Sequence, residues 1–439
     1  MKSIALRTLI PLTLFCAQAH SADLLEVYRQ ALAQDPVYAS ARYAFEAAKE
    51  TIPQARAGLL PTVTLNGNYL RNHRNTEGVP TLDFNTNSYS LSLNQPGFRM
   101  QNWIAFQQAG LQAKQAEAVF ADAQQNIIVR VAQAYFDVLL AQDNVTLSGA
   151  QKAAVSEQLA QAKRNFEVGT STIVDTYEAQ SRYDLAAAKE IADRNDLEIK
   201  QRALQQLVGK LTPSLAVLRD KLELPLPAPN DMEQWVSSSE QTSPTIAQSQ
   251  ATYEVARKEI ERNRAGHYPT LDFVTTYSEN TTPTSNAFGQ LGPSLTTKST
   301  QFGIQVSVPI FQGGGTQSRV RQSISNRDKS AQDLENTKRV VAQNVRQSFL
   351  GVTNGVAQVK ALEAALVSSQ ASLDSTKLGK DVGVRTNVDV LNSQQQLFQA
   401  RRDLQQARYN TILSQLRLKS AVGRLGEDDV AEVNRMLQN

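Results

Sequence analysis

The feature that most constrains this chain is an internal duplication. The segment "VGTSTIVDTYEAQ" at 168–180 returns as "VGVRTNVDVLNSQ" at 382–394, with Val, Gly, Thr, Val, Asp and Gln in register. Residues 36–62 align in the same way with 244–270, and both copies carry the runs Arg-Ala-Gly and Pro-Thr. Two copies of one unit predict two halves with the same order of elements.

The boundary between the repeats is expected at the proline-rich linker "LPLPAPN", so the first repeat covers 23–223 and the second 224–439. Proline placement indicates what each repeat contains. No proline lies between Pro96 and Pro213, and none follows Pro309. Because proline breaks helix interiors, very long helices are permitted in both stretches.

We expect one helix over 100–166 and another over 314–378, each about 100 Å long at ~1.5 Å per residue. A shorter helix should return from each of them. The apolar residues in these regions recur at coiled-coil spacing, and many of them are small. The long helices are therefore expected to pack as hairpins and to need neighbours on both sides.

Short segments with alternating apolar and polar residues predict two strands in each repeat. The clearest is "QFGIQVSV", in which Phe, Ile and two Val residues alternate with polar residues and glycine. Polar loops are expected between the strands of each pair, at 71–86 and 279–299. The predicted strands cover about 62–70, 87–95, 270–278 and 300–309.

The first 22 residues have the pattern of a secretory signal peptide. Lys2 and Arg7 precede the apolar stretch "LIPLTLFCA", and cleavage is expected after Ala19 or Ala22. Ala22 is favoured because a helix-like segment follows it at once. The one cysteine of the chain, Cys16, lies inside this signal, so the mature protein would contain none.

Composition argues against a nucleic-acid partner and against an enzyme. The chain has 45 Lys and Arg against 42 Asp and Glu, a nearly neutral balance. It carries no nucleotide-binding motif and no metal-ligand spacing, so neither a cofactor nor a metal is expected. His73 and His267 are expected to be solvated rather than catalytic.

Four strands with one apolar face have the length needed to cross a membrane obliquely. Four strands cannot close, however, and an open sheet edge leaves backbone groups unpaired in lipid. If the strands lie in a membrane, several copies of the chain must share one barrel. The alternative is an ordinary four-stranded sheet packed against helices in a soluble protein.

Both duplicated segments predict the tip of a helical hairpin, at about 168–175 and 380–389. A glycine that accepts the left-handed conformation ends the incoming helix, and a threonine begins the next one as its N-cap. An aspartate three residues later completes a capping box. These residues are Gly169, Thr172 and Asp175 in the first tip, and Gly383, Thr386 and Asp389 in the second.

The signal peptide, the duplicated strand–strand–long-helix plan and the paired "VG…T..VD" tips together resemble the TolC family of outer-membrane channel proteins. Local matches include "NFEVG" at 165–169 and "ARYN" at 407–410. The resemblance implies a mainly α fold with a small β part. It also implies a homotrimer, in which each chain gives four strands to a 12-stranded outer-membrane β-barrel continued by a periplasmic α-helical barrel.

The function implied by this resemblance is an exit duct for type I secretion or multidrug efflux. The protein would lie in outer-membrane lipid with a large periplasmic part. A periplasmic adaptor and an inner-membrane transporter would open it by docking. A soluble periplasmic coiled-coil adaptor is the alternative, although an adaptor would need one hairpin in a β-rich body rather than two equivalent hairpins.

The resemblance also assigns gate residues by position. Asp175 and Arg385 would form a closing link, Arg408 would be a further latch residue, and Asp389 would form an acidic constriction ring. Asn392 stands where the family has a second ring carboxylate, so the ring should hold about half the charge.

Two further positions depart from the family pattern. Lys380 occupies the position of the latch tyrosine, and Val174 that of a threonine. Because only the second tip carries Arg385 and Asn392, we expect the gate to lie chiefly in that tip, with Asp175 as its partner.

Overall fold

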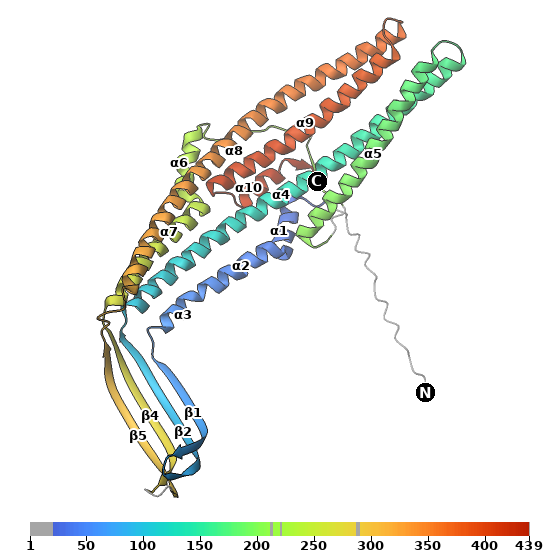
Figure 1. Ribbon diagram of the computed structural model, residues 1–439. Helices are drawn as coiled ribbons and strands as arrows, with labels where there is room; N and C mark the ends of the chain where they lie inside the picture. Colours follow the sequence, from blue (N-terminus) through green and yellow to red (C-terminus); the bar gives the residue numbers. More distant parts are fainter. Residues whose placement is uncertain (1–20, 211–213, 220–221, 287–289, 439) are drawn as a thin grey trace, which may run out of the picture.

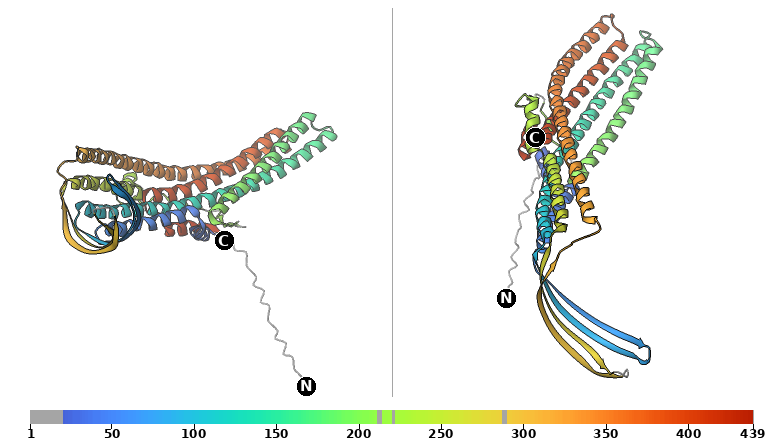
Figure 2. Two further views of the ribbon diagram at one scale, coloured as in Figure 1. Left: turned by 60° about the horizontal axis from the view of Figure 1, so that its bottom comes forward. Right: turned by 60° about the vertical axis from the view of Figure 1, so that its left-hand side comes forward.

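The computed structural model describes residues 21–210, 214–219, 222–286 and 290–438, so all but the end of the predicted signal lies outside the described residues. The molecule is long and curved. A sheet forms one end, two helical hairpins form the other, and short helices surround the middle (Figures 1 and 2). This is the mainly α fold with a small β part that the sequence predicted.

Both repeats follow one order: short helices, two strands, a long helix and a returning helix. The first contains α1 (Leu24–Gln34), α2 (Pro36–Lys49), α3 (Thr51–Ala57), β1 (Thr62–Thr76), β2 (Val79–Phe98), α4 (Met100–Glu167) and α5 (Ile173–Val208). The second contains α6 (Met232–Thr242), α7 (Pro244–Arg264), η1 (Ala265–His267), β4 (Thr270–Ser285), β5 (Leu291–Ser307), α8 (Gly315–Asp381) and α9 (Asn387–Val422). The remaining elements are β3 (Val217–Leu218), α10 (Glu427–Asn434) and β6 (Leu437–Gln438).

The long helices agree closely with the sequence. α4 has 68 residues and α8 has 67, and each returns through a helix of 36 residues. α4 and α5 form one hairpin and α8 and α9 the other, with both tips at the end farthest from the sheet (Figure 1). None of the helices in the described part of the chain is long and apolar enough to cross a membrane.

The strands are longer than predicted, and the two expected polar loops are wrong. The antiparallel sheet has the order β1-β2-β4-β5, and its strands have 15, 20, 16 and 17 residues. Pairing continues through the expected loops, as at Arg71 with Asn85 and Thr281 with Thr296. The alternating pattern ends earlier because it reports where side chains meet an apolar surface, whereas the backbone ladder needs no apolar side chains.

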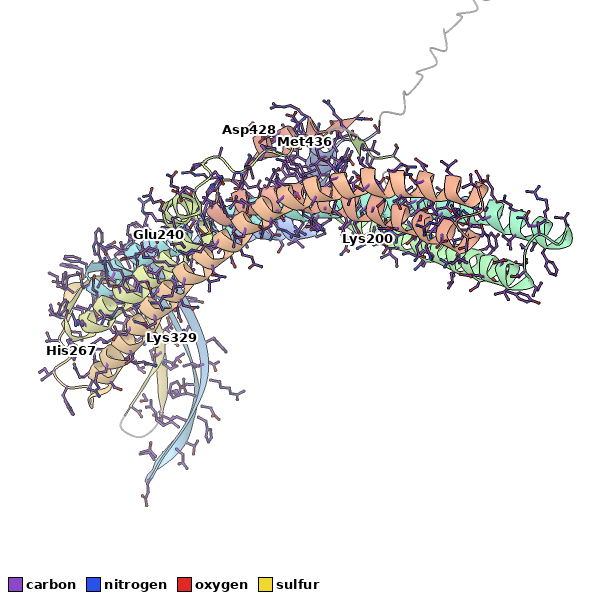
Figure 3. All side chains as sticks on the ribbon, turned by 90° about the horizontal axis from the view of Figure 1, so that it is seen from above. Lys200, Glu240, His267, Lys329, Asp428 and Met436 are labelled. Carbon is purple, nitrogen blue, oxygen red and sulfur yellow. The ribbon has the colours of Figure 1, made fainter. Side chains whose placement is uncertain are left out.

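The largest cluster of buried apolar residues lies at mid-length, where α1 and α10 pack against α4 and α9. Tyr135 of α4 is fully buried there and donates from its hydroxyl to the carbonyl oxygen of Ala216 at 2.7 Å. Asp428 and Met436 mark this thickened region in Figure 3, and the exposed His267 marks the junction with the strands. The middle of the molecule is therefore its best-packed part.

Ala22, the favoured end of the signal peptide, belongs to this core. It is buried, its amide donates to the Ser214 carbonyl at 2.9 Å, and its carbonyl accepts from the Ala216 amide at 3.1 Å. The residue thus pairs as a short bridge with the segment that follows α5.

Packing is much thinner toward the hairpin tips. The buried clusters there contain only a few residues, several of them small. They are Leu159, Ala162 and Ala179 in the first hairpin, and Leu373, Val390 and Leu397 in the second. Polar contacts therefore matter more for holding the tips together than they do in the middle of the molecule.

Candidate gate at the hairpin tips

The two tips have the same backbone geometry. Gly169 and Gly383 both lie in the left-handed region, with φ of 75° and 80°. In each turn an amide past the glycine bonds back into the last helical turn: Thr170 to the Asn165 carbonyl at 2.8 Å, and Val384 to the Gly379 carbonyl at 2.9 Å. A side chain other than glycine would strain either turn.

Each returning helix begins with a complete capping box. In the first tip, the Thr172 amide donates to Oδ2 of Asp175 at 3.0 Å, and the Asp175 amide donates to Oγ1 of Thr172 at 3.3 Å. In the second, the corresponding distances between Thr386 and Asp389 are 2.9 and 3.2 Å. Both aspartates therefore hold the first turn of their own helix.

The electrostatic surroundings of Asp389 include a nearby cation. Hydrogen bonds from the Thr386 amide and hydroxyl, together with the positive charge of Arg385, hold the pKa of the Asp389 carboxyl below its usual range. The first tip has Ser171 at the position of Arg385. The second tip thus adds a cation beside its capping carboxylate.

Polar side chains link the two hairpins near their tips. Lys380 of α8 donates from Nζ to Oε1 of Gln161 on α4 at 2.8 Å. About one helical turn away along α4, Gln158 donates from Nε2 to Oε1 of Gln394 on α9 at 2.7 Å. The residue at the family's latch-tyrosine position therefore does bridge the hairpins, through an amide partner.

A third link comes from Arg182 of α5, which the sequence did not single out. Its Nη2 donates to Oδ1 of Asn392 at 2.9 Å and pairs with Oε1 of Glu178 at 3.2 Å, while Nη1 donates to Gln395 at 3.3 Å. Glu178 and Asn392 are equivalent positions of the two repeats. One guanidinium thus holds the corresponding polar residues of both hairpins.

Asp175 and Arg385 do not contact each other within one protomer. Among the described residues no ion pair joins them, and one oxygen of the Asp175 carboxylate is used by its capping box. Asp175 instead shares a small cleft of about 220 Å³ with Lys380 and Thr386, lying between the two tips. The predicted link between Asp175 and Arg385 is absent from the protomer.

Arg408 lies away from the tips and bonds inside the second hairpin. Its Nη2 pairs with Oε1 of Glu363 on α8 at 2.8 Å. Beside it, the Tyr409 hydroxyl donates to Oδ2 of Asp143 on α4 at 2.8 Å, and burial raises the pKa of the Asp143 carboxyl. At this level the hairpins are joined by Tyr409, whereas Arg408 stays within its own hairpin.

The three links between the hairpins were missed because each joins residues more than 200 positions apart. Helical periodicity predicts which residues share a face of one helix. It does not predict how two hairpins are rotated against each other. The equivalence of Glu178 and Asn392 was visible in the repeat, but their shared partner Arg182 has Gln396 as its counterpart and gave no signal.

Comparison with known proteins agrees with this geometry. The chain matches the outer membrane efflux protein family over residues 27–210 and 235–424. It is 33% identical to the outer membrane protein TolC of Vibrio cholerae serotype O1, over 95% of this chain and 94% of that protein. It is 31% identical to the alkaline protease secretion protein AprF of Pseudomonas aeruginosa, over 95% of this chain and 88% of that protein.

The fold is also that of a solved outer-membrane channel. The crystal structure of the Campylobacter jejuni CmeC outer membrane channel superposes with a TM-score of 0.79, covering 94% of this chain and 90% of that one at 17% sequence identity. The duplicated hairpins and strands, the matched segments and the full-length relatives give one conclusion: the chain belongs to the outer membrane efflux protein family.

Proposed function

We propose that three copies of this chain form an outer-membrane channel, the exit duct of a type I secretion or multidrug efflux system. The periplasmic hairpin tips close it, and docking of an adaptor with an inner-membrane transporter opens it. A gate at the tips is supported by the polar links between the two hairpins, which lie where apolar packing is thinnest. Relatives of this length are channel and secretion proteins, which fits a protein without catalytic activity.

Trimer formation is supported by what one protomer leaves unpaired. In the described sheet β1 pairs only with β2, and β5 only with β4, so both outer edges are free. Just after β5, Ile310 is 94% exposed and Phe311 is 85% exposed. A neighbouring copy would satisfy the backbone groups of the edges and cover these side chains, and three copies of four strands would close a barrel.

The strength of the polar links suits a gate. A hydrogen bond at the surface contributes about 0.5–1.5 kcal/mol net, and an exposed ion pair about 0–1 kcal/mol. Several such links in each of three protomers hold the tips together, yet each is weak enough to be replaced by contacts with a docking partner. Val168 and Val384, 72% and 76% exposed at the tips, provide apolar surface for that partner.

The gate residues assigned by resemblance remain part of this proposal. Because Asp175 and Arg385 do not meet inside a protomer, their link would form between neighbouring protomers, and Arg408 would act through the second hairpin. Asp389 would face the constriction. Alanine at Arg385 or Asp175 is expected to raise the single-channel conductance in lipid bilayers. Unchanged conductance in both variants would remove this link from the proposal.

Export by a cleaved signal also belongs to the proposal, with cleavage after Ala19 rather than Ala22. Cleavage after Ala22 would remove the buried Ala22 and its two backbone hydrogen bonds to the segment after α5. Cleavage after Ala19 keeps them. The intact mass of the purified mature protein decides between the two sites.

Membrane fractionation combined with bilayer recording tests the function as a whole. A heat-sensitive trimer in the outer-membrane fraction that forms discrete conducting channels is the expected result. A protein peripheral to the inner membrane that forms no channels would contradict the proposal and would favour a periplasmic adaptor.

A further inference from the structure

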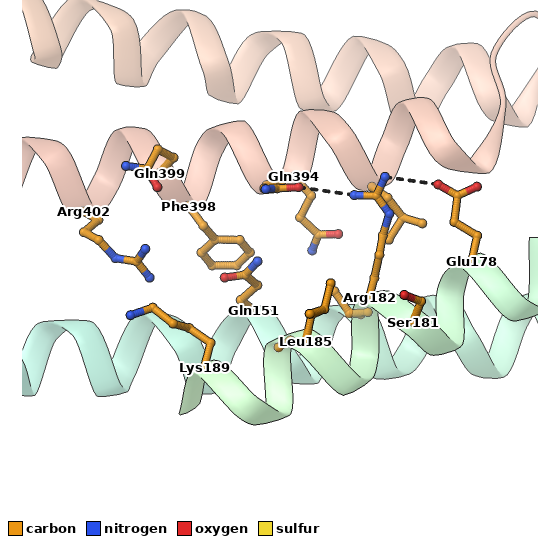
Figure 4. A pocket seen from close by; sticks show the side chains of 14 residues that line it. Gln151, Glu178, Ser181, Arg182, Leu185, Lys189, Gln394, Phe398, Gln399 and Arg402 are labelled. Carbon is orange, nitrogen blue, oxygen red and sulfur yellow. Dashed lines mark hydrogen bonds and ion pairs between the residues drawn. The ribbon is translucent and has the colours of Figure 1, made fainter. Parts of the chain in front are cut away.

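A cleft of about 520 Å³ lies between α5 and α9, with α4 as its floor. It begins beside Arg182 and extends away from the tips along both helices (Figure 4). Its volume falls in the range of sites that hold small organic molecules. The capping boxes and the links between the hairpins do not fill it.

The charges that line this cleft are unbalanced. Arg182, Lys189 and Arg402 contribute three cations, and Glu178 is the single carboxylate of the lining. Arg182 is occupied by Glu178, and the Lys189 ammonium pairs with Asp193 of its own helix at 2.6 Å. Arg402 of α9 is left as the cation without a partner among the described residues of the lining, and its Nε atom is buried.

Neutral side chains that could contact a flat ligand line the same cleft as this guanidinium. The Phe398 ring and the Leu185 side chain provide apolar surface, and the amide of Gln151 provides hydrogen-bond donors. In Figure 4, Lys189 and Arg402 approach the space between the helices from opposite sides, on α5 and α9. A cleft that combines a guanidinium, an aromatic ring and an amide donor suits an anionic group carried on an apolar or aromatic body.

We infer that this cleft binds a small aromatic anion, a carboxylate or sulfonate, with Arg402 as its main charged contact. That the ligand is cargo in passage, held next to the gate, rests on the proposed function; that the cleft binds it does not. Its class follows from the unpaired guanidinium and the apolar surface around it. A neutral aromatic molecule would leave Arg402 unpaired, and a simple inorganic anion would leave Phe398 and Leu185 unused.

The test uses pyranine, a water-soluble aromatic trisulfonate whose fluorescence anisotropy rises when it binds protein. The full mature chain in nonionic detergent should bind pyranine saturably, and less tightly as salt is raised. Arg402→Gln should weaken binding about tenfold, the loss expected for a charged hydrogen bond. The neighbouring Arg401 lies outside this cleft and donates from Nη2 to Gln370 of α8 at 3.4 Å, so Arg401→Gln makes the same change of charge and should leave the affinity unchanged.

A second variant tests the cleft if Arg402→Gln folds poorly. Gln151→Glu places a carboxylate on the α4 wall and should also weaken pyranine binding. No saturable binding, or equal affinities for Arg402→Gln and Arg401→Gln, would overturn the inference. Recording conductance from the same preparations without dye separates the two proposals: channels without dye binding refute only the cleft, and dye binding without channels refutes only the duct.

Discussion

The two hairpin tips share one backbone and differ in their side chains. Both turn through a left-handed glycine, and both begin the returning helix with a Thr–Asp capping box whose distances agree within about 0.1 Å. The second tip alone carries a cation beside its capping aspartate, at Arg385, and an amide at Asn392 in place of Glu178. The first tip supplies Arg182, which binds both of these equivalent positions.

This difference shows how a duplicated unit makes contacts that neither copy makes alone. The shared residues build the turn, which every hairpin needs. Among the positions that diverged, Glu178 and Asn392 come together across the two hairpins, at the guanidinium of Arg182. Because Asn392 is neutral, it shares Arg182 with Glu178 without placing a second negative charge there. The asymmetry of the tips is therefore where we expect gating to reside.

Among these substitutions, loss of the Arg182 side chain should change the conductance of the channel most. Arg182→Ala removes the contacts of α5 with α9 and leaves Glu178 without its partner, so the closed channel should loosen and its single-channel conductance should rise severalfold in planar bilayers. The matched control is Gln396→Ala, at the equivalent and exposed position of the second repeat, which should conduct like the unsubstituted protein. If both variants behave alike, the asymmetry between the tips has no role in closure.

A second effect separates the two capping aspartates. Asp389→Asn should weaken the block of the channel by multivalent cations added on the periplasmic side, because this residue is the proposed acidic ring. Asp175→Asn makes the same change in the first tip; it should raise the conductance by breaking the proposed link to Arg385, but should shift the blocking concentration less than Asp389→Asn does. Identical block curves for the two variants would remove Asp389 from the constriction.

The two capping boxes, which the tips share, should contribute equally to the stability of their helices. Thr172→Ala and Thr386→Ala each remove one N-cap and should destabilise the first turn of their helices by about 1 kcal/mol. Amide hydrogen exchange of the first turns of α5 and α9 measures this loss. A much larger effect in one tip would show that the capping boxes are not equivalent.

The smallest expected effect concerns the pH at which cation block at Asp389 is lost. Because the pKa of Asp389 is lowered from its ordinary value of 3.8, the stability it adds to its helix is fully present above that value and is lost as the pH falls through the lower, folded-state pKa. Cation block should therefore persist as the pH is lowered to the ordinary aspartate range and decline only below it. Half-loss of block at or above the ordinary value would show that repulsion within the proposed ring of carboxylates outweighs the Thr386 hydrogen bonds and the charge of Arg385.

Much of the fold could be predicted because its determinants are local or repeated. Missing prolines and coiled-coil spacing gave α4 and α8 nearly to the residue, and the repeat gave both capping boxes. The full length of β1 could not be predicted, because beyond Leu70 its backbone continues to pair with β2 while its own side chains are polar. The partners of Lys380 and Arg182 depend on how the hairpins are rotated, a property of the packed structure.

We propose that the two hairpins of one protomer are held together by polar links at their tips and must part for the channel to open. The mature chain is expected to contain no cysteine, so Gln161→Cys and Lys380→Cys can be introduced together with Arg182→Ala. A short, reducible cross-linker between the two thiols replaces the link between α4 and α8. Bilayer recording should show high conductance in the reduced protein and a return to the low conductance of the unsubstituted protein after cross-linking. Unchanged high conductance in the fully cross-linked protein would show that links between the two hairpins of a protomer do not hold the channel closed.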